Sequence, residues 1–387
     1  MFVVVRDLPS HLHMCSVLDN DDAARDENSK EFGINRQSCL TQLQDCDMCS
    51  GMLISDLTHD LYEGVLQHEV KLVLKHCIQQ RHYFTLDMFN GSIQYTELGY
   101  MEVCNRPTPI TKKVLKSSDR SLGQKAAQMA LLARLFPFMV AHNIPEDDRF
   151  WINFLLLLSI VDLLMAPQIT HDEVTYLQLL VQQHHEEFVA LYPEEVVTPN
   201  MHYMVHMPGL ILKFGPLVHH WTMRYEAKHN HFKKLAQNVG NYINLSWTLA
   251  LRHQQWPCYQ WMMTGVPDEI EVGPGKMLVE ECRPHDFQSA NTCYRAKWVT
   301  FAGQKYQPMC IVILGVDEDY PVFGQVQELY MIDTTKPMAI VTVMSTLTFN
   351  VHYHGYILGY STSIRAISLK TLHSPFPLHV QMVTNWW

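Results

Sequence analysis

Residues 200–234 read NMHYMVHMPGLILKFGPLVHHWTMRYEAKHNHFKK and gather histidine and acidic side chains between apolar positions. His202 and His206 lie four residues apart, so on a helix they share one face. Two imidazoles at this spacing can clamp zinc or another borderline metal, although two core histidines with satisfied ring nitrogens give the same pattern. Glu226 follows in the motif MRYEAKH. It is a candidate acid of an assembled site, and a helix ion pair with a neighbouring lysine or arginine is the alternative.

A second cluster lies far upstream, in residues 55–65, which read SDLTHDLYEGV. On a helix its acids and its histidine lie along one face, and they are Asp56, His59, Asp60 and Glu63. Asp60 is the runner-up acid of the cluster, and its side chain is expected to face solvent. Two distant clusters of the same residue types predict one assembled site, with capping of the following helix as the alternative role for Asp56.

The two clusters resemble elements of CACTA/En-Spm-type DNA transposases, above all the animal transposase-derived proteins of that group. The upstream cluster is similar to their Asp-x-x-His element. The downstream one is similar to their His-x-x-x-His, Gly-Pro and Trp-Thr-Met-Arg-Tyr-Glu elements. Further stretches match in the same order, namely FGINRQS (32–38), ELGYMEVCNRPTPI (97–110), QKAAQM (124–129), IPEDDRFW (144–151) and VGPGK (272–276). The resemblance implies an RNase H-like, Asp-Asp-Glu metal-dependent nuclease ancestry.

The resemblance also implies roles for single residues. It places the family's second catalytic acid at Asp56, with His59 as its companion, and the final catalytic acid at Glu226. It makes His202 and His206 the paired histidines, with a structural or metal-organising role. Carboxylates bridge hard cations in two-metal phosphodiester chemistry, so Mg²⁺ or Mn²⁺ is the expected cofactor if the chain is active.

One element of the family is missing. The first catalytic aspartate and its CxxC should precede the FGINR-like segment, where this chain has only residues 1–31. The first hypothesis is therefore a transposase-derived, catalytically silent protein that binds DNA or a protein partner. The alternative is an active metal-dependent nuclease or transposase that uses Asp56 and Glu226, with Asp7 or a partner subunit supplying the missing acid. The third is a fragment without a stable fold.

Composition limits the classes of partner and compartment. The chain has 387 residues, of which 47% are hydrophobic and 18% charged, as in a globular protein of two or three domains. A net charge of −10 argues against a chain-wide basic DNA-binding surface, though not against a local patch. Scattered cysteines and no visible signal peptide favour a nuclear or cytoplasmic protein, not a secreted one. Residues 150–165 are apolar but shorter than the roughly 20 residues of a membrane span, so we expect a buried helix and no membrane partner.

The spacing of apolar residues predicts an α+β protein. Residues 1–31 are expected to be polar and poorly ordered, and residues 32–275 to form an α-rich remnant of an RNase H-like catalytic domain. Residues 280–387 are expected to form a small antiparallel β-barrel that offers a surface to a protein partner, with the HYH motif at 352–354 on a strand. Helices are predicted over residues 53–79, 122–141, 150–165, 171–191, 201–213, 221–237 and 244–263.

Overall fold

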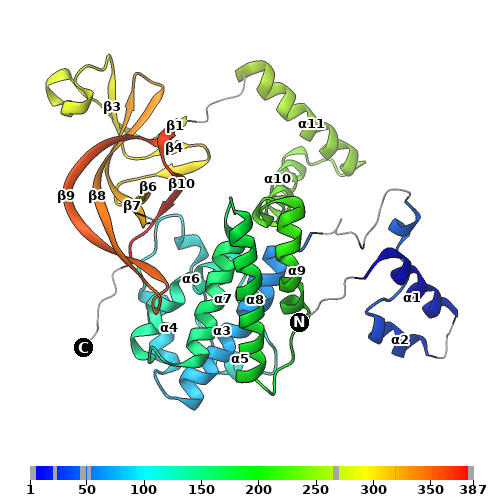
Figure 1. The fold of residues 1–387 in the computed structure, drawn as a ribbon. Helices are drawn as coiled ribbons and strands as arrows, with labels where there is room; N and C mark the ends of the chain where they lie inside the picture. The colour runs from blue at the N-terminus through cyan, green and yellow to red at the C-terminus, as the bar shows by residue number, and fades with distance from the viewer. Residues whose placement is uncertain are drawn as a thin grey trace. The chain divides into compact units, whose positions relative to one another are not determined.

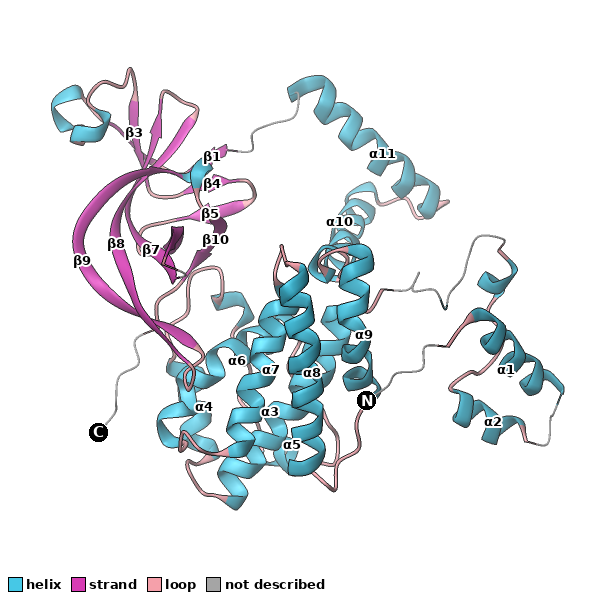
Figure 2. Cartoon of the chain, viewed as in Figure 1, coloured by secondary structure: helices cyan, strands magenta, loops and turns pink. Residues whose placement is uncertain are grey.

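The computed structural model describes residues 6–20, 24–43, 49, 54–264, 270–318 and 320–381. The chain divides into two compact units. Unit 1 comprises residues 1–82, 110–133 and 146–226, and unit 2 comprises residues 83–109, 134–145 and 227–387. The described part of unit 1 is helical, and every described strand belongs to unit 2 (Figure 2). The predicted α+β class is confirmed.

Unit 1 is built from α-helices joined by short 3₁₀ and π-helical segments. Its α-helices, of which α6 and α10 continue into unit 2, are α1 (Leu8–Asn20), α2 (Arg25–Phe32), α3 (Leu66–Lys75), α5 (Lys112–Lys116), α6 (Ala126–Val140), α7 (Arg149–Met165), α8 (His171–Leu191), α9 (Pro199–Phe214) and α10 (Met223–Val239). The shorter segments are η1 (Cys39–Gln42), η3 (Thr58–Val65), η4 (His76–Gln80) and η7 (Leu217–His219).

Helix α3 lies at the centre of unit 1, beside α7 and α8 (Figure 1). With η3 and η4 it makes one continuous helical run over residues 58–80. The apolar spacing there predicts an amphipathic helix with a solvent-facing side. The structure instead buries every residue from 66 to 74, polar ones included. The described residues before Ile270 contain no strand, so the RNase H-like ancestry stays a prediction.

Local signals explain where the long helices begin. Helix α7 begins after Asp148, whose side chain accepts a hydrogen bond from the N–H of Trp151 at 3.0 Å. Helix α8 begins with a capping box, in which Thr170 and Glu173 each satisfy the other's backbone N–H. Helix α9 begins at Pro199, where the missing N–H costs nothing. These caps are encoded in the sequence itself, so helices form close to the predicted bounds.

The N-terminal segment differs from its prediction. Residues 1–31 were expected to be poorly ordered, but helices α1 and α2 form within the described part of this segment. Cys15 and Leu18 of α1 form a small buried cluster with Ile34. Gly33 ends α2 with a φ of 64°, a left-handed conformation that suits glycine. The prediction was wrong because a few apolar residues in a polar stretch are enough for this local packing.

Unit 2 combines helices of various lengths with two antiparallel sheets. Its complete helical elements are α4 (Leu86–Tyr95), α11 (Leu245–Thr264), η5 (Val103–Asn105), η6 (Ala141–Asn143), η8 (Glu280–Cys282), η9 (His285–Phe287) and η10 (Leu369–Thr371). Its strands are β1 (Ile270–Val272), β2 (Gly275–Met277), β3 (Cys293–Ala296), β4 (Val299–Phe301), β5 (Gln304–Tyr306), β6 (Ile311–Asp317), β7 (Tyr320–Ile332), β8 (Lys336–Asn350), β9 (Gly355–Ser368) and β10 (Ser374–Leu378).

The larger sheet is open. Strands β1, β4 and β5 form a small sheet, and the larger one has the order β10-β6-β7-β3-β2 with β8 on β7 and β9 on β8. The long strand β7 pairs with β6 along its first half and with β3 along its second half, while β8 runs along its other side. Among the described strands β9 pairs only with β8. The predicted barrel is therefore wrong, because closure requires a terminal strand such as β9 to pair with a strand at the opposite edge.

The β-rich region also differs in detail from the sequence prediction. Strands β1 and β2 precede residue 280 and pair with β4 and β3, so the sheets begin at Ile270. The HYH motif lies in the turn between β8 and β9 and not on a strand. In that turn the Nε2–H of His352 donates to the backbone oxygen of Ala141 at 2.8 Å, and His354 has a φ of 49°.

No helix among the described residues is both long and apolar enough to cross a membrane. The most apolar one, α7, buries Trp151, Phe154 and Leu157 within unit 1. This agrees with the expectation of a buried core helix at residues 150–165.

We expect residues 270–387 to form a more stable isolated fragment than residues 280–387. The shorter fragment lacks β1 and β2, so the edges of β4 and β3 lose their partners. Thermal unfolding followed by circular dichroism compares the two, and each lost kcal/mol lowers the midpoint by roughly 4–8 °C in a fragment of this size. Equal midpoints would contradict a structural role for β1 and β2.

Candidate functional site

Asp56 lies just before η3, and both of its oxygens are engaged. The backbone N–H of Thr222 donates to Oδ1 at 2.9 Å, and the Thr222 hydroxyl donates to Oδ2 at 2.6 Å. The N–H groups of Thr58 and His59 also donate to this carboxylate, at 3.3 and 3.4 Å. Asp56 therefore caps the helix that follows it and, at the same time, ties that helix to the segment before α10.

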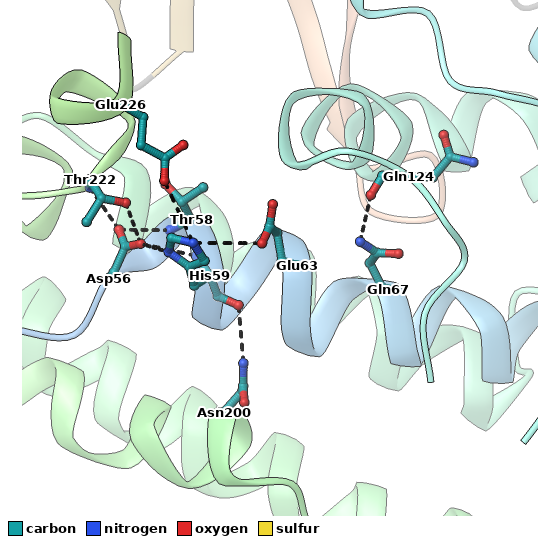
Figure 3. A network of polar contacts seen from close by, with 9 residues as sticks. All are labelled: Asp56, Thr58, His59, Glu63, Gln67, Gln124, Asn200, Thr222 and Glu226. Atoms are coloured by element: carbon teal, nitrogen blue, oxygen red, sulfur yellow. Dashed lines mark hydrogen bonds and ion pairs between the residues drawn. The ribbon is translucent and has the colours of Figure 1, made fainter. Parts of the chain in front are cut away.

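His59 stands between three carboxylates, as Figure 3 shows. Its Nδ1 forms a hydrogen bond with Asp56. Its Nε2 lies 3.8 Å from Oε1 of Glu226 and 3.9 Å from Oε2 of Glu63. One imidazole ring thus separates Asp56 from Glu226, so the expected proximity of these three site residues is confirmed. Their chemical role stays a prediction.

A close approach of two helices brings the two sequence clusters together. The side-chain amide of Asn200, at the start of α9, donates to the backbone oxygen of His59 at 3.2 Å. The same side chain occupies the space where a β-carbon on residue 64 would lie. Gly64 therefore leaves room for the Asn200 side chain, and a larger residue at this position would force that side chain to turn away from His59.

The charges in the cluster stabilise one another. Burial disfavours the Asp56 carboxylate, but hydrogen bonds from Thr222 and His59 outweigh it and hold the pKa of Asp56 below its usual value. The hydrogen bond to Asp56 raises the pKa of His59, and the charges of Glu63 and Glu226 add to this. These contacts therefore stabilise the imidazolium form of His59 relative to a free imidazole, and that form would offset part of the negative charge around it.

Asp60 does not face solvent as expected, because its residue is only 9% exposed. Burial, together with the nearby charge of Asp56, raises the pKa of Asp60 to about 6. The expectation assumed α-helical spacing, whereas η3 is a π-helix, in which side chains are distributed differently around the axis.

Glu226 and the paired histidines occupy more open positions. Glu226 lies in the first turn of α10, with a side chain 57% exposed. The Nε2 atoms of His202 and His206 lie 3.2 Å apart on α9. Burial and the neighbouring His202 lower the pKa of His206. Both histidines line a cavity of about 670 Å³ together with Tyr203 and Cys49.

The paired histidines and the acids do not form a shared metal site in the described structure. No described hydrogen bond or ion pair links His202 or His206 to Asp56 or Glu226. Across the described residues, no group of three or more His, Cys, Asp or Glu side chains is arranged to hold a metal ion. The ligand roles implied for these four residues therefore stay predictions.

Comparison with protein-family models, with curated proteins and with solved structures finds no match to this chain. The resemblance to CACTA/En-Spm-type transposases thus rests on the quoted motifs alone.

The sequence prediction missed a set of buried polar side chains on α3 and η4. Each meets a partner from a distant segment, and the pairs are Gln67 with the backbone of Leu122 and Gln124, His68 with Glu195, Glu69 with His184, Lys71 with Ser117 and Asp119, and His76 with Asp148. The Glu69–His184 pair, 3.1 Å apart, is almost completely buried on both sides. A single sequence carries no signal for these contacts, because the partners lie 46 or more residues away.

We expect Asp56→Asn to destabilise the chain by about 1–3 kcal/mol. The substitution removes the negative charge that Thr222 and His59 contact. It also replaces one accepting oxygen by an NH₂ group, which then faces the N–H and O–H groups that donated to that oxygen. Urea unfolding measures the change, with the exposed Asp147→Asn as the matched control, which should lie within about 0.5 kcal/mol of the wild type. An Asp56 variant as stable as this control would show that the cluster does not hold η3 in place.

The raised pKa of Asp60 gives a pH dependence with a definite sign. The folded chain holds this proton up to a pH of about 6, whereas the usual aspartate value is 3.8, so the stability contributed by Asp60 falls as pH rises between these values. Asp60→Asn is expected to raise the free energy of unfolding at pH 7.5 by about 1–2 kcal/mol and to change it little near pH 4. Urea unfolding at both pH values measures this change. If Asp60→Asn changed the free energy of unfolding equally at the two pH values, the prediction would be contradicted.

Proposed function

We propose that the chain is a transposase-derived, nuclear DNA-binding protein whose inherited acid and imidazole cluster holds the fold together and does not cleave DNA. The collinear motifs, from FGINRQS to VGPGK, support the ancestry. The main evidence for the proposal that the cluster does not cleave DNA is the environment of Asp56. Both of its oxygens accept hydrogen bonds from Thr222, and the His59 ring forms a further hydrogen bond with Oδ2.

The energetics favour this structural role. A metal ion at Asp56 would have to compete with two hydrogen bonds from Thr222 and with the hydrogen bond from the His59 ring. Two-metal displacement needs carboxylates that bridge both ions, and in this cluster the His59 ring lies between Asp56 and Glu226. The cluster as it stands is a polar contact between η3 and the start of α10, in which His59 meets carboxylates from both segments.

One observation favours a second candidate, an active metal-dependent nuclease. The carboxylates of Asp56, Glu63 and Glu226 all converge on one imidazole. If His59 turned away as a neutral ring, these acids would be suitable oxygen ligands for Mg²⁺ or Mn²⁺. Asp7 does not take part in this arrangement, since its side chain accepts from the N–H of Ser10 and caps α1.

The experiment is a cleavage assay with the purified full chain, supercoiled and linear DNA, and Mg²⁺ or Mn²⁺. We expect no cleavage above that of Asp56→Ala and Glu226→Ala, while the wild type still retards DNA in a gel. Cleavage that both substitutions abolish, and that Asp147→Asn keeps, would establish the nuclease candidate instead. His59→Gln tests the bridge directly, because a gain of metal-dependent cleavage in this variant would show that the imidazole blocks a competent site.

A further inference from the structure

Helices α10 and α11 carry a local charge opposite to that of the chain. Residues 227–264 contain no Asp or Glu, although the net charge of the whole protein is −10. The basic residues of this segment are all exposed, and they are Lys228, Lys233, Lys234 and Arg252. A positive segment of this kind attracts polyanions, and no Asp or Glu within the segment weakens that attraction.

Helix α11 also exposes aromatic rings that no described part of the chain covers. Trp247 is 71% exposed and Trp261 is 69% exposed, and no described residue of α11 is buried. Tryptophan normally buries most of its large apolar surface, so an exposed row of such rings indicates a surface that is covered in a complex. The further exposed aromatic residues of this segment are Tyr242, Trp256 and Tyr259.

The rings and the cations belong to one pair of helices. Trp247, Leu251 and Trp261 fall on one face of α11 at 3.6 residues per turn, and the two tryptophans are separated by about 21 Å along the axis. The ring of His253 on α11 contacts His231 and Phe232 on α10, with ring centres 5.6 and 5.2 Å apart. Lys233 and Lys234 follow directly after this contact.

We propose that the α10–α11 pair, residues 227–264, binds an unpaired nucleic-acid strand. The exposed rings of α11 stack on bases, and the lysines of α10 contact phosphates, the combination that single-strand binding surfaces use. A duplex hides the faces of its bases, so rings of this kind favour a strand whose bases are free. The inference deepens the proposed function and rests on it for the choice of DNA as the ligand.

Charge complementarity favours nucleic acid over the other occupants of such a surface. Lysine is depleted from the cores of protein–protein interfaces, whereas this pair of helices carries exposed lysines on α10 as well as exposed aromatic rings on α11. A second copy bound through the same pair of helices would bring two acid-free basic segments together, and their like charges would repel. A polyanion with stackable bases satisfies both the charge and the rings.

The test measures binding of the full chain to a labelled single-stranded 20-mer and to the matching duplex by fluorescence anisotropy. Trp247→Ala with Trp261→Ala is expected to weaken single-strand binding at least about tenfold, with an unchanged salt dependence. Lys233→Gln with Lys234→Gln is expected to reduce the slope of log K against log salt by about 1.4. The exposed Tyr176 on α8 supplies the control, and Tyr176→Ala should bind as the wild type does.

Conservative variants keep the test decisive. Trp247→Phe with Trp261→Phe retains rings that stack, so binding is expected to stay within about threefold of wild type, and circular dichroism checks that α11 remains helical. Alanine and glutamine variants of the α10–α11 pair that bind like the wild type would overturn the inference and leave the proposed DNA binding in place. A chain that binds no DNA would overturn both. A dimer that the alanine variants dissolve, without an effect on single-strand binding, would assign the face to a second copy.

Discussion

The structure of unit 1 depends on the burial of a polar helix. Residues 66–74 of α3 have no exposed side, so Gln67, His68, Glu69 and Lys71 lose water and must recover their hydrogen bonds within the protein. Their partners come from four later segments of the chain. Each partner is therefore fixed in space by the need to satisfy a buried group, and loss of one would leave a buried polar atom or charge uncompensated.

The candidate site extends this arrangement at the start of the same helical run. Asp56 and His59 precede α3 by a few turns, and they too reach a distant segment, through Thr222 and Glu226. The difference is exposure, because the side chain of His59 is 52% exposed whereas that of His184 is completely buried. The buried pairs join segments that are distant in the sequence, and the acids around His59 lie at the more exposed end of the same helical run.

Sequence reasoning succeeded where the signal is local. Helix α8 begins and ends at the predicted residues, His171 and Leu191, and its start is fixed by a capping box encoded within four residues. The grouping of Asp56 with Glu226 came from motif resemblance and not from spacing. The burial of Asp60 and the partners of Glu69 could not be predicted, because they depend on π-helical geometry and on contacts between distant segments. The open sheet was missed for the same kind of reason, since closure depends on pairing between strands at its two ends.

Strand β9 has a consequence for the behaviour of the protein in solution. It is 14 residues long, and among the described strands only β8 pairs with it, so β9 is an edge strand of the larger sheet. Exposed apolar side chains such as Ile357 and Ile364 lie on this edge strand. Such an edge is a template for strand addition by another polypeptide. We therefore expect any self-association at high concentration to involve this edge, and a proline or lysine introduced along it to oppose strand addition without touching the acid cluster.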